Sequence, residues 1–345
     1  PPRLDHPKPN RANTLPIDTL RRFGDVAPLT EHNKQLARTV AMMGKSKRGA
    51  RLLQSLEAND VRLGGLKPGQ AFGYYLARDR ALYSQTQSVA QAVRIIAHEA
   101  RHCEQTVAGW STITEDHEPG TKLPHDTRSY LRLNRVLEAD ADTTALAVMW
   151  EIAQADPSFQ PAWDELRGDV HFGPMVKSFE AAAKATGGKP LSERAVTAGM
   201  RAAFETWPTV GEPLRSEGYD RYLIAWLETQ AQGWEKPVQA DRPFTIRDIG
   251  KITALNEAKP YWTPAHSERV AASFDQFAED FKARFKAMDA QLRPPLLEPS
   301  LKAGGASIAY GPHPLPKLAT WRGKLPSTNE TAVPYQPEDN HPTGP

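Results

Sequence analysis

The chain has 345 residues, and its 43 Lys and Arg nearly balance its 41 Asp and Glu, which leaves a formal net charge of +2. A charge this close to zero gives no reason to expect nucleic acid or an acidic membrane surface as a partner. The single cysteine, Cys103, excludes an intramolecular disulfide, and no apolar run reaches the roughly 18 residues that a membrane span requires.

The N-terminal part of the chain predicts an extended arm followed by two helices. Residues 1–28 are rich in Pro, Arg and Asn without a hydrophobic period, so an extended N-terminal arm is expected there. Thr30 is a good N-cap, and apolar residues recur at helical spacing after it. After Gly44, Ser46 opens a second predicted helix with leucines on one face.

Two short strands are expected next. Gly64-Gly65 and Pro68-Gly69 are typical of turns, and the hydrophobic period changes after them. Residues 72–77 and 81–84 are apolar and aromatic, which favours strands joined by a tight connection.

The following helix carries the pattern H-E-x-x-H in Ala97-His98-Glu99-Ala100-Arg101-His102. His98 and His102 are four residues apart, so both imidazoles lie on one helix face and can reach a single metal ion. An apolar stripe lies on the opposite face and is expected to dock the helix: Val89, Val93, Ile96, Ala100, Cys103 and Val107. We therefore interpret the two histidines as metal ligands and Cys103 as a packing residue.

A third ligand is available in residues 130–153, a run without Gly or Pro that is rich in helix formers. Apolar residues surround most of this predicted helix, so it should be buried, and buried carboxylates are costly unless they are paired or bind a metal. Glu138 and Asp142 share one face, whereas Asp140 points elsewhere. A solvated acidic face is the alternative interpretation. If Glu138 is not a ligand, Asp140 is the next candidate. If Glu138 is a ligand, Asp140→Asn should leave the affinity for the metal nearly unchanged.

An H-E-x-x-H pattern followed 40 residues later by E-x-x-A-D resembles the gluzincin group of zinc metallopeptidases. The resemblance implies that His98, His102 and Glu138 hold one zinc ion per chain. It also implies that Glu99 is the catalytic base and that Asp142 hydrogen-bonds a ligating histidine. The expected fold class is α+β, with a zincin-like core of a small sheet and two active-site helices.

The zincin-like core is expected over residues 29–155, where the resemblance also implies a strand that borders the cleft and can pair with an extended peptide. The related metzincin group is excluded, because Gln105 and Ala108 stand where that group has Gly and His. A long loop at 109–126 is expected to form a cleft wall or lid. Its His117 and His125 are then candidate site residues, with ordinary exposed histidines as the alternative.

The rest of the chain predicts a helical region, residues 156–292, that completes the cleft, and a Pro-rich tail, residues 293–345. Tyr219 and Tyr222 are candidates for a donor to the oxyanion, with structural tyrosines as the alternative. Helices are expected at about 161–186, 192–207, 216–234, 245–255 and 267–292.

These patterns predict a zinc-dependent peptidase that acts on a peptide or protein through a metal-activated water, with Glu99 as general base. One alternative is a scaffold of zincin fold that binds a metal or a partner without cleaving; another is a metal-dependent amidase acting on a non-protein substrate. The presence of Glu99 favours hydrolysis, because a structural site needs no base. The sequence leaves the oligomeric state open. No signal peptide is visible, so localisation is open between the cytoplasm and secretion without disulfides.

Overall fold

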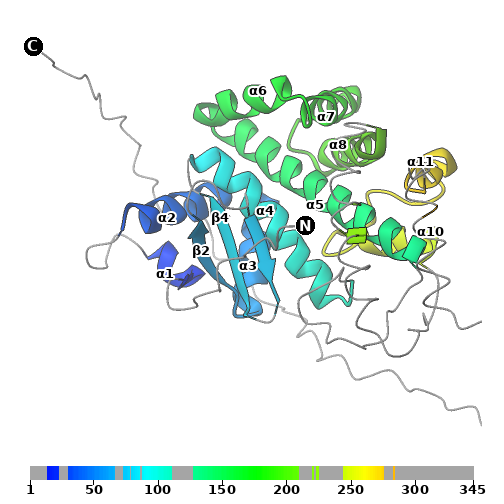
Figure 1. Cartoon of the computed structure of the whole chain (residues 1–345). Helices are drawn as coiled ribbons and strands as arrows, with labels where there is room; N and C mark the ends of the chain where they lie inside the picture. The colour runs from blue at the N-terminus through cyan, green and yellow to red at the C-terminus, as the bar shows by residue number, and fades with distance from the viewer. Residues whose placement is uncertain are drawn as a thin grey trace, which may run out of the picture. The chain divides into compact units, whose positions relative to one another are not determined.

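The computed structural model describes residues 14–22, 30–66, 73–77, 79–85, 88–110, 127–209, 220, 223–224, 244–275 and 283. These residues form an α+β fold that is mostly helical and contains one small mixed sheet (Figure 1). In chain order the elements are β1 (Thr14–Pro16), α1 (Ile17–Arg21), α2 (Glu31–Met43), α3 (Lys47–Ala58), β2 (Arg62–Leu66), β3 (Gly73–Leu76), β4 (Ala81–Gln85), α4 (Val89–Val107), α5 (Thr127–Ala155), η2 (Pro157–Phe159), α6 (Gln160–Gly168), α7 (Gly173–Ala185), α8 (Glu193–Thr206), η3 (Trp207–Thr209), α10 (Ile246–Ile252) and α11 (Glu268–Ser273).

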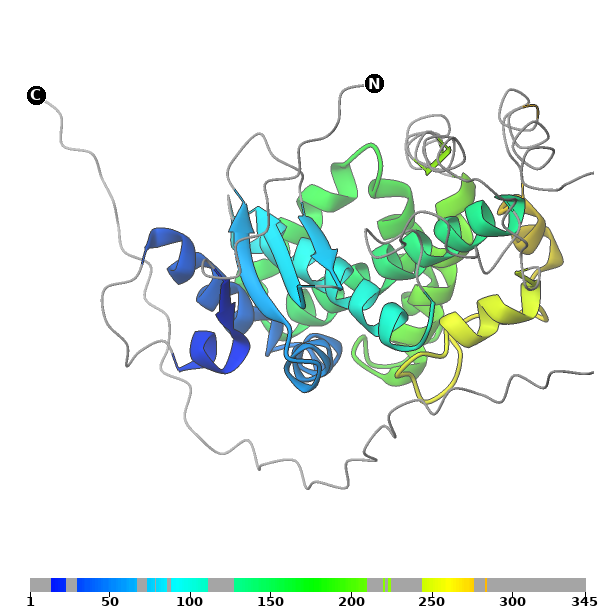
Figure 2. The same ribbon diagram turned by 60° about the horizontal axis from the view of Figure 1, so that its bottom comes forward.

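The sheet has four strands in the order β1-β2-β4-β3. The central strands β2 and β4 are parallel, and β1 and β3 pair antiparallel with them on the outside. Figure 2 shows the strands with α4 beside them, and α4 packs on both β4 and β3. The strands expected at 72–77 and 81–84 are therefore confirmed, and β3 lies next to the helix that carries H-E-x-x-H.

Strand β2 is not expected from the sequence, because Gly64-Gly65 is typical of a turn. A Cβ on Gly64 would lie 2.8 Å from the ring of Tyr83, and a Cβ on Gly65 would lie 1.0 Å from Nε2 of His32. Glycine is required at both positions because side chains of β4 and α2 occupy the space beside the strand. This close approach is a tertiary property that no local pattern reveals.

Residues 14–21 differ from the extended arm expected for residues 1–28. Thr14–Pro16 pair with β2, and α1 follows without a break. Ile17 and Leu20 are each 1% exposed and belong to the main hydrophobic core. Two apolar residues three apart are too short a pattern to predict a helix. Burial of such side chains nevertheless stabilises by about 1.5–3 kcal/mol each, which explains why this segment docks.

The N-caps expected for the two helices that precede the H-E-x-x-H helix are confirmed. The Thr30 side chain accepts a hydrogen bond from the Asn33 N–H at the start of α2. The Ser46 side chain accepts one from the Gly49 N–H at the start of α3.

The single helix expected at about 161–186 is two helices, α6 and α7. Between them, the Asp169 carboxylate accepts hydrogen bonds from the backbone N–H groups of His171 and Phe172. Asp169 has extended backbone, and Pro174 stands in the first turn of α7, where its missing N–H costs no hydrogen bond, whereas inside a continuous helix it would remove one. A local carboxylate cap and a proline therefore break a run whose apolar spacing continues across the gap.

Other downstream predictions are met where the structure describes them. The helix expected at 192–207 is α8, and α10 and α11 lie within the helices expected at 245–255 and 267–292. The predictions for 111–126, for most of 216–234 and for the tail at 293–345 fall outside the described residues.

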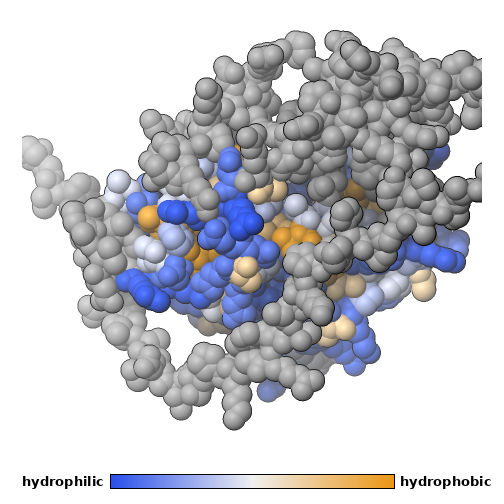
Figure 3. All heavy atoms as spheres, turned by 90° about the horizontal axis from the view of Figure 1, so that it is seen from below, coloured by the Kyte–Doolittle hydropathy of each residue, from blue (hydrophilic) through white to orange (hydrophobic). Residues whose placement is uncertain are grey.

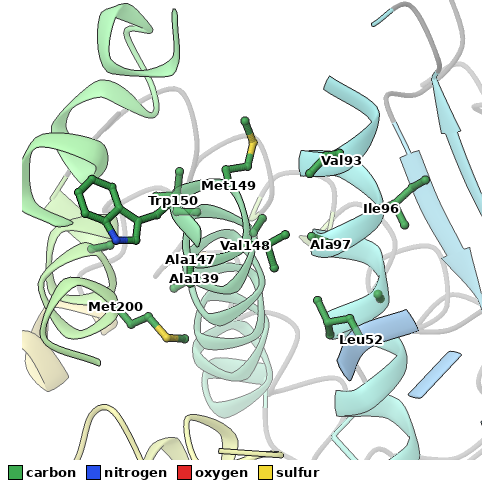
Figure 4. Close-up of a cluster of buried hydrophobic side chains, with 14 of the residues drawn as sticks. Leu52, Val93, Ile96, Ala97, Ala139, Ala147, Val148, Met149, Trp150 and Met200 are labelled. Carbon is green, nitrogen blue, oxygen red and sulfur yellow. The ribbon is translucent and has the colours of Figure 1, made fainter. Parts of the chain in front are cut away.

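The long helix α5 lies at the centre of the hydrophobic core, as its all-round apolar pattern predicts. Figure 4 shows Val148 directed toward Ala97 of α4, while Trp150 and Ala147 lie on the side of Met200 of α8. All five side chains are at most 4% exposed. The core thus continues from the sheet and α4 through α5 to the later helices, and the acidic residues of α5 are buried with it.

The described surface in Figure 3 is mainly hydrophilic, with smaller apolar areas between polar ones. Within the described part of the chain, every helix falls short of the length or the apolarity needed to cross a bilayer.

Candidate metal centre

Helix α4 is buried on two sides. Its N-cap is Ser88, whose hydroxyl accepts from the Gln91 N–H. Of the expected apolar stripe, Val93 through Cys103 are fully buried in the core, whereas Val107 is 42% exposed at the helix end. The opposite face is covered by α5, so His98 is only 9% exposed. Packing against α5 brings the histidines to the acidic residues of that helix.

Three side chains meet between α4 and α5. Nε2 of His98 lies 3.3 Å from Oε2 of Glu138, and Nε2 of His102 lies 3.6 Å from Oε1 of the same carboxylate. One nitrogen or oxygen atom from each of the three residues can be chosen so that all lie within 4.8 Å of one another. The structure therefore brings together the three residues that the sequence suggests as ligands, and this group could bind a metal ion.

The hydrogen bonds of His98 determine which ring nitrogen is free. Its Nδ1 lies 3.1 Å from Oδ1 of Asp142, and the other oxygen of Asp142 accepts from Nε1 of Trp207 at 2.9 Å. A carboxylate can only accept, so Nδ1 of His98 carries the proton. Its Nε2 then presents a lone pair to the centre.

The same argument applies to His102, whose Nδ1 lies 2.7 Å from Oε1 of Gln105. The amide nitrogen of Gln105 donates to the Leu137 carbonyl at 3.1 Å and to Asp140 Oδ2 at 2.8 Å, and both of these atoms are acceptors. The Gln105 oxygen must therefore face His102 and accept from Nδ1–H. His102 also presents the lone pair of Nε2 to the centre.

The two Nε2 atoms are only 3.0 Å apart. In neutral rings with protonated Nδ1 atoms, two lone pairs would face one another at this distance, which is repulsive unless a cation lies beside both. Oε2 of Glu138 adds a buried carboxylate oxygen without a hydrogen bond among the described residues. Two imidazoles and one carboxylate form a ligand set typical of catalytic zinc sites, so the residues present fit a bound metal ion.

The pKa shifts of His98, His102 and Glu138 arise from the close approach of the two imidazoles to this carboxylate. Burial lowers the pKa of His98, but the neighbouring carboxylates of Asp142 and Glu138 outweigh burial and raise it. The pKa of His102 is likewise raised by Glu138 against the effect of burial. Burial raises the pKa of Glu138, but the two histidines outweigh it and lower that pKa. Without a metal, protons on the imidazoles would balance the carboxylate, and a bound metal ion would replace them.

Glu99 lies between α4 and the edge of the sheet. Burial raises the pKa of its carboxyl, against the lowering effect of the two histidines and of a hydrogen bond from the Tyr75 backbone. A Cβ on Gly73 would lie 2.3 Å from Ile95 and 3.4 Å from the Cγ of Glu99. The absence of a side chain at Gly73 allows β3 to approach α4 this closely, and it brings the strand next to Glu99.

A cleft with a volume of about 950 Å³ opens beside the centre. His98 and Glu99 line it, with Gly73 of β3 on one side. Leu166 of α6 and Phe172, just before α7, contribute to its lining on the other side. The sequence predicts that residues 156–292 complete the cleft, but it does not predict the α6–α7 break that forms this wall.

Several other expected site residues cannot be placed. Tyr219 and Tyr222, the candidate oxyanion donors, lie outside the described residues, as do His117 and His125 of the predicted lid. Cys103 is fully buried in the core and is a packing residue, as expected.

Two residues support the centre through hydrogen bonds that the sequence does not predict: Gln105, which contacts His102, and Trp207, which contacts Asp142. For Gln105 a signal exists, because it lies three residues after His102 and hence on the same helix face. For Trp207 there is none, because 65 residues separate it from Asp142.

Comparison with known proteins agrees with this geometry at the level of the family. Neither the curated proteins nor the solved structures contain a match to the chain. One family model matches residues 22–234, which is more than half of the chain and includes α4 and α5 with all the residues of the centre. The chain therefore belongs to the Putative metallopeptidase family (DUF6782).

Proposed function

We propose that the protein is a zinc-dependent peptidase whose centre is formed by His98, His102 and Glu138, as in gluzincins. The observation that carries the proposal is the pair of imidazole Nε2 atoms 3.0 Å apart, with the two oxygens of the Glu138 carboxylate 3.3 and 3.6 Å from them. A structural zinc site is usually closed by four protein ligands. Among the described residues this centre has three, and it lies beside a cleft, which favours catalysis over a scaffold role.

A zinc ion held by these residues would supply the Lewis acidity that activates water and polarises a peptide carbonyl. Glu99 acts as general base: its carboxylate takes a proton from the attacking water and delivers it to the nitrogen of the leaving amine. Burial raises the pKa of Glu99, which makes its protonated form more accessible for the second transfer. Asp142 holds the proton on Nδ1 of His98 and so keeps Nε2 available as a ligand.

The substrate proposed for this site is a peptide or protein segment in extended conformation. Among the described strands, β3 forms one end of the sheet with β4 as its neighbour, and an extended peptide would add to the sheet at this end. The strand also lines the cleft at Gly73, next to Glu99. Backbone pairing of this kind orients a peptide bond without depending on its side chains.

The first test is the metal content of the purified protein. We expect about one zinc per chain in the wild type and a large loss in His98→Ala, because that variant removes one of three ligands. Purification without chelators that yields no metal, or full retention of metal in Glu138→Ala, would contradict the proposed ligands.

The second test is hydrolysis by Glu99→Gln, with Glu205→Gln on α8 as the matched control. Loss of a general base typically slows turnover by about 10²–10⁴-fold, while the metal content should stay at the wild-type level. Casein, short peptides and peptidoglycan fragments should be assayed side by side. Cleavage of the fragments alone would support the amidase alternative, and metal binding without any hydrolysis would support the scaffold.

A further inference from the structure

The two ligating histidines are supported by different chemistry. His98 donates to a carboxylate, that of Asp142, whereas His102 donates to the neutral amide of Gln105. A carboxylate fixes the tautomer of its histidine by itself, because it can only accept. An amide does not, because its two ends are a donor and an acceptor of nearly the same shape.

The orientation of the Gln105 amide therefore matters for metal binding. If the amide were reversed, its NH₂ group would face Nδ1 of His102, and that nitrogen would have to be the unprotonated one. The proton would then sit on Nε2, the atom that faces the centre, and this atom could not bind a metal. Whatever fixes the orientation of Gln105 thus decides whether His102 is a ligand.

Two acceptors fix that orientation, the carbonyl of Leu137 and Oδ2 of Asp140. Gln105 is 1% exposed and Asp140 is fully buried, so water does not compete for these hydrogen bonds. Both acceptors belong to α5, the helix that also supplies Glu138. The packing of α4 on α5 therefore sets the position of the third ligand and the amide orientation together.

Asp140 is held in turn by residues from other elements. Nε and Nη2 of Arg101 donate to its two oxygens at 2.7 and 3.2 Å, and the hydroxyl of Tyr261 donates to Oδ1 at 2.6 Å. Arg101 is itself fully buried and also donates to the carbonyls of Ile252 and Leu255. Because Arg101 and Tyr261 donate to both of its oxygens, this carboxylate is held in place as an acceptor for Gln105.

We infer that Gln105 is a positioning residue for His102, and that Asp140, held by Arg101 and Tyr261, acts on the metal through Gln105. This inference rests on the proposed function, because it takes His102 to be a ligand. It changes one expectation from the sequence. Asp140 does point away from the three ligands, yet Asp140→Asn should weaken metal binding, because it removes the acceptor charge that orients Gln105.

The test compares Gln105→Met, which keeps the length of the side chain but offers only a weak acceptor, with Gln154→Met as control. Gln154 lies on α5, 12 residues beyond Asp142 and thus about 18 Å along the helix. Competition with a chelator gives the zinc affinity of each folded protein. We expect about 10- to 100-fold weaker binding for Gln105→Met, as for other partners of zinc-bound histidines, and no change for Gln154→Met.

A spectroscopic measurement separates this role from a purely structural one. In the protein loaded with Co²⁺, the visible absorption bands report the ligand field, so Gln105→Met should shift them if the orientation of His102 changes. A purely structural role would lower the free energy of unfolding while leaving both the zinc affinity and the Co²⁺ spectrum at wild-type values. That result would overturn the inference.

A measurement on the wild type covers the case in which Gln105→Met does not fold. With ¹⁵N-labelled histidine and bound zinc, the ring of His102 should carry its proton on Nδ1, and a proton on Nε2 would overturn the inference. His102→Ala tests the proposed function separately. If His102→Ala abolishes zinc binding while Gln105→Met leaves it unchanged, the inference fails and the ligand set stands. If His102→Ala retains zinc, the ligand set fails.

Discussion

At the scale of single residues, the centre depends on which atoms can donate and which can only accept. His98 and His102 can serve as metal ligands only while Asp142 and Gln105 hold their ring protons on the outer nitrogens. Asp142 is itself oriented by the indole of Trp207, which lies 65 residues away in sequence. The proposed ligand set is therefore readable from the sequence pattern, whereas the protonation that it requires depends on residues outside that pattern.

Asp142→Asn tests this dependence at His98. The change keeps the size of the side chain and one oxygen but removes the negative charge that stabilises the imidazole. We expect about 10- to 100-fold weaker zinc affinity with the fold intact, a smaller loss than for Glu138→Gln. Titration of both variants with a competing chelator shows which of them binds zinc more weakly. A larger loss for Asp142→Asn than for Glu138→Gln would exchange the roles assigned to these two carboxylates.

At the scale of elements, short polar contacts connect helices that are far apart in the sequence. Asp156 stands between α5 and η2, where it accepts from the N–H and the hydroxyl of Ser158. Lys45, in the α2–α3 connection, donates to the same carboxylate at 2.7 Å. The hydrogen bonds from Lys45 and Ser158 lower the pKa of Asp156 from 3.8 to about 2.

The lowered pKa of Asp156 predicts a pH dependence of stability. A carboxylate with a folded-state pKa below its unfolded value stabilises the fold above the unfolded pKa, and that contribution is lost as the pH falls through the folded pKa. The difference in free energy of unfolding between wild type and Asp156→Asn should therefore be constant above about pH 5 and shrink between about pH 4 and pH 2. Urea unfolding at a series of pH values measures it, and a difference that stays the same down to pH 2.5 would contradict the assignment.

At the scale of the whole molecule, a buried ionic cluster joins segments far apart in sequence. The guanidinium of Arg48 on α3 contacts Glu151 of α5 at 2.5 Å, Glu193 of α8 at 2.6 Å and Glu257 at 3.0 Å. Its side chain is 2% exposed, and those of Glu151 and Glu257 are 6% exposed. The helices before the motif are thereby connected to those after it, within one compact unit.

Arg48→Met is expected to be strongly destabilising, because it leaves Glu151 and Glu257 buried with one cation fewer. Breaking a buried ion pair from one side typically costs about 3–5 kcal/mol. Lys47→Met is the matched control, since Lys47 is 80% exposed and its pair with Glu193 should contribute at most about 1 kcal/mol. Denaturant unfolding gives both values, and equal losses for the two variants would show that the cluster does not hold the helices together.

The features that the sequence determined by itself are those set by local geometry. The i and i+4 spacing places His98 with His102, and Glu138 with Asp142, on single helix faces wherever those helices go. The lack of helix breakers in 130–153 ensures that α5 forms, and its all-round apolar surface ensures that it is buried. These properties follow from backbone periodicity and from the cost of exposing apolar surface, and both can be read along the chain.

Other features depend on which side chains from distant segments contact a residue, and only the tertiary structure decided these. Gly64-Gly65 form a strand and not a turn because Tyr83 and His32 fill the space beside them. Residues 14–21 fold because the core offers a place for two isolated apolar side chains. Gln105 and Asp140 support the centre because the packing of α4 on α5 brings a donor to an acceptor across 35 residues. Steric fit and hydrogen-bond pairing between distant segments have no period in the sequence, so they exist only once the helices have met.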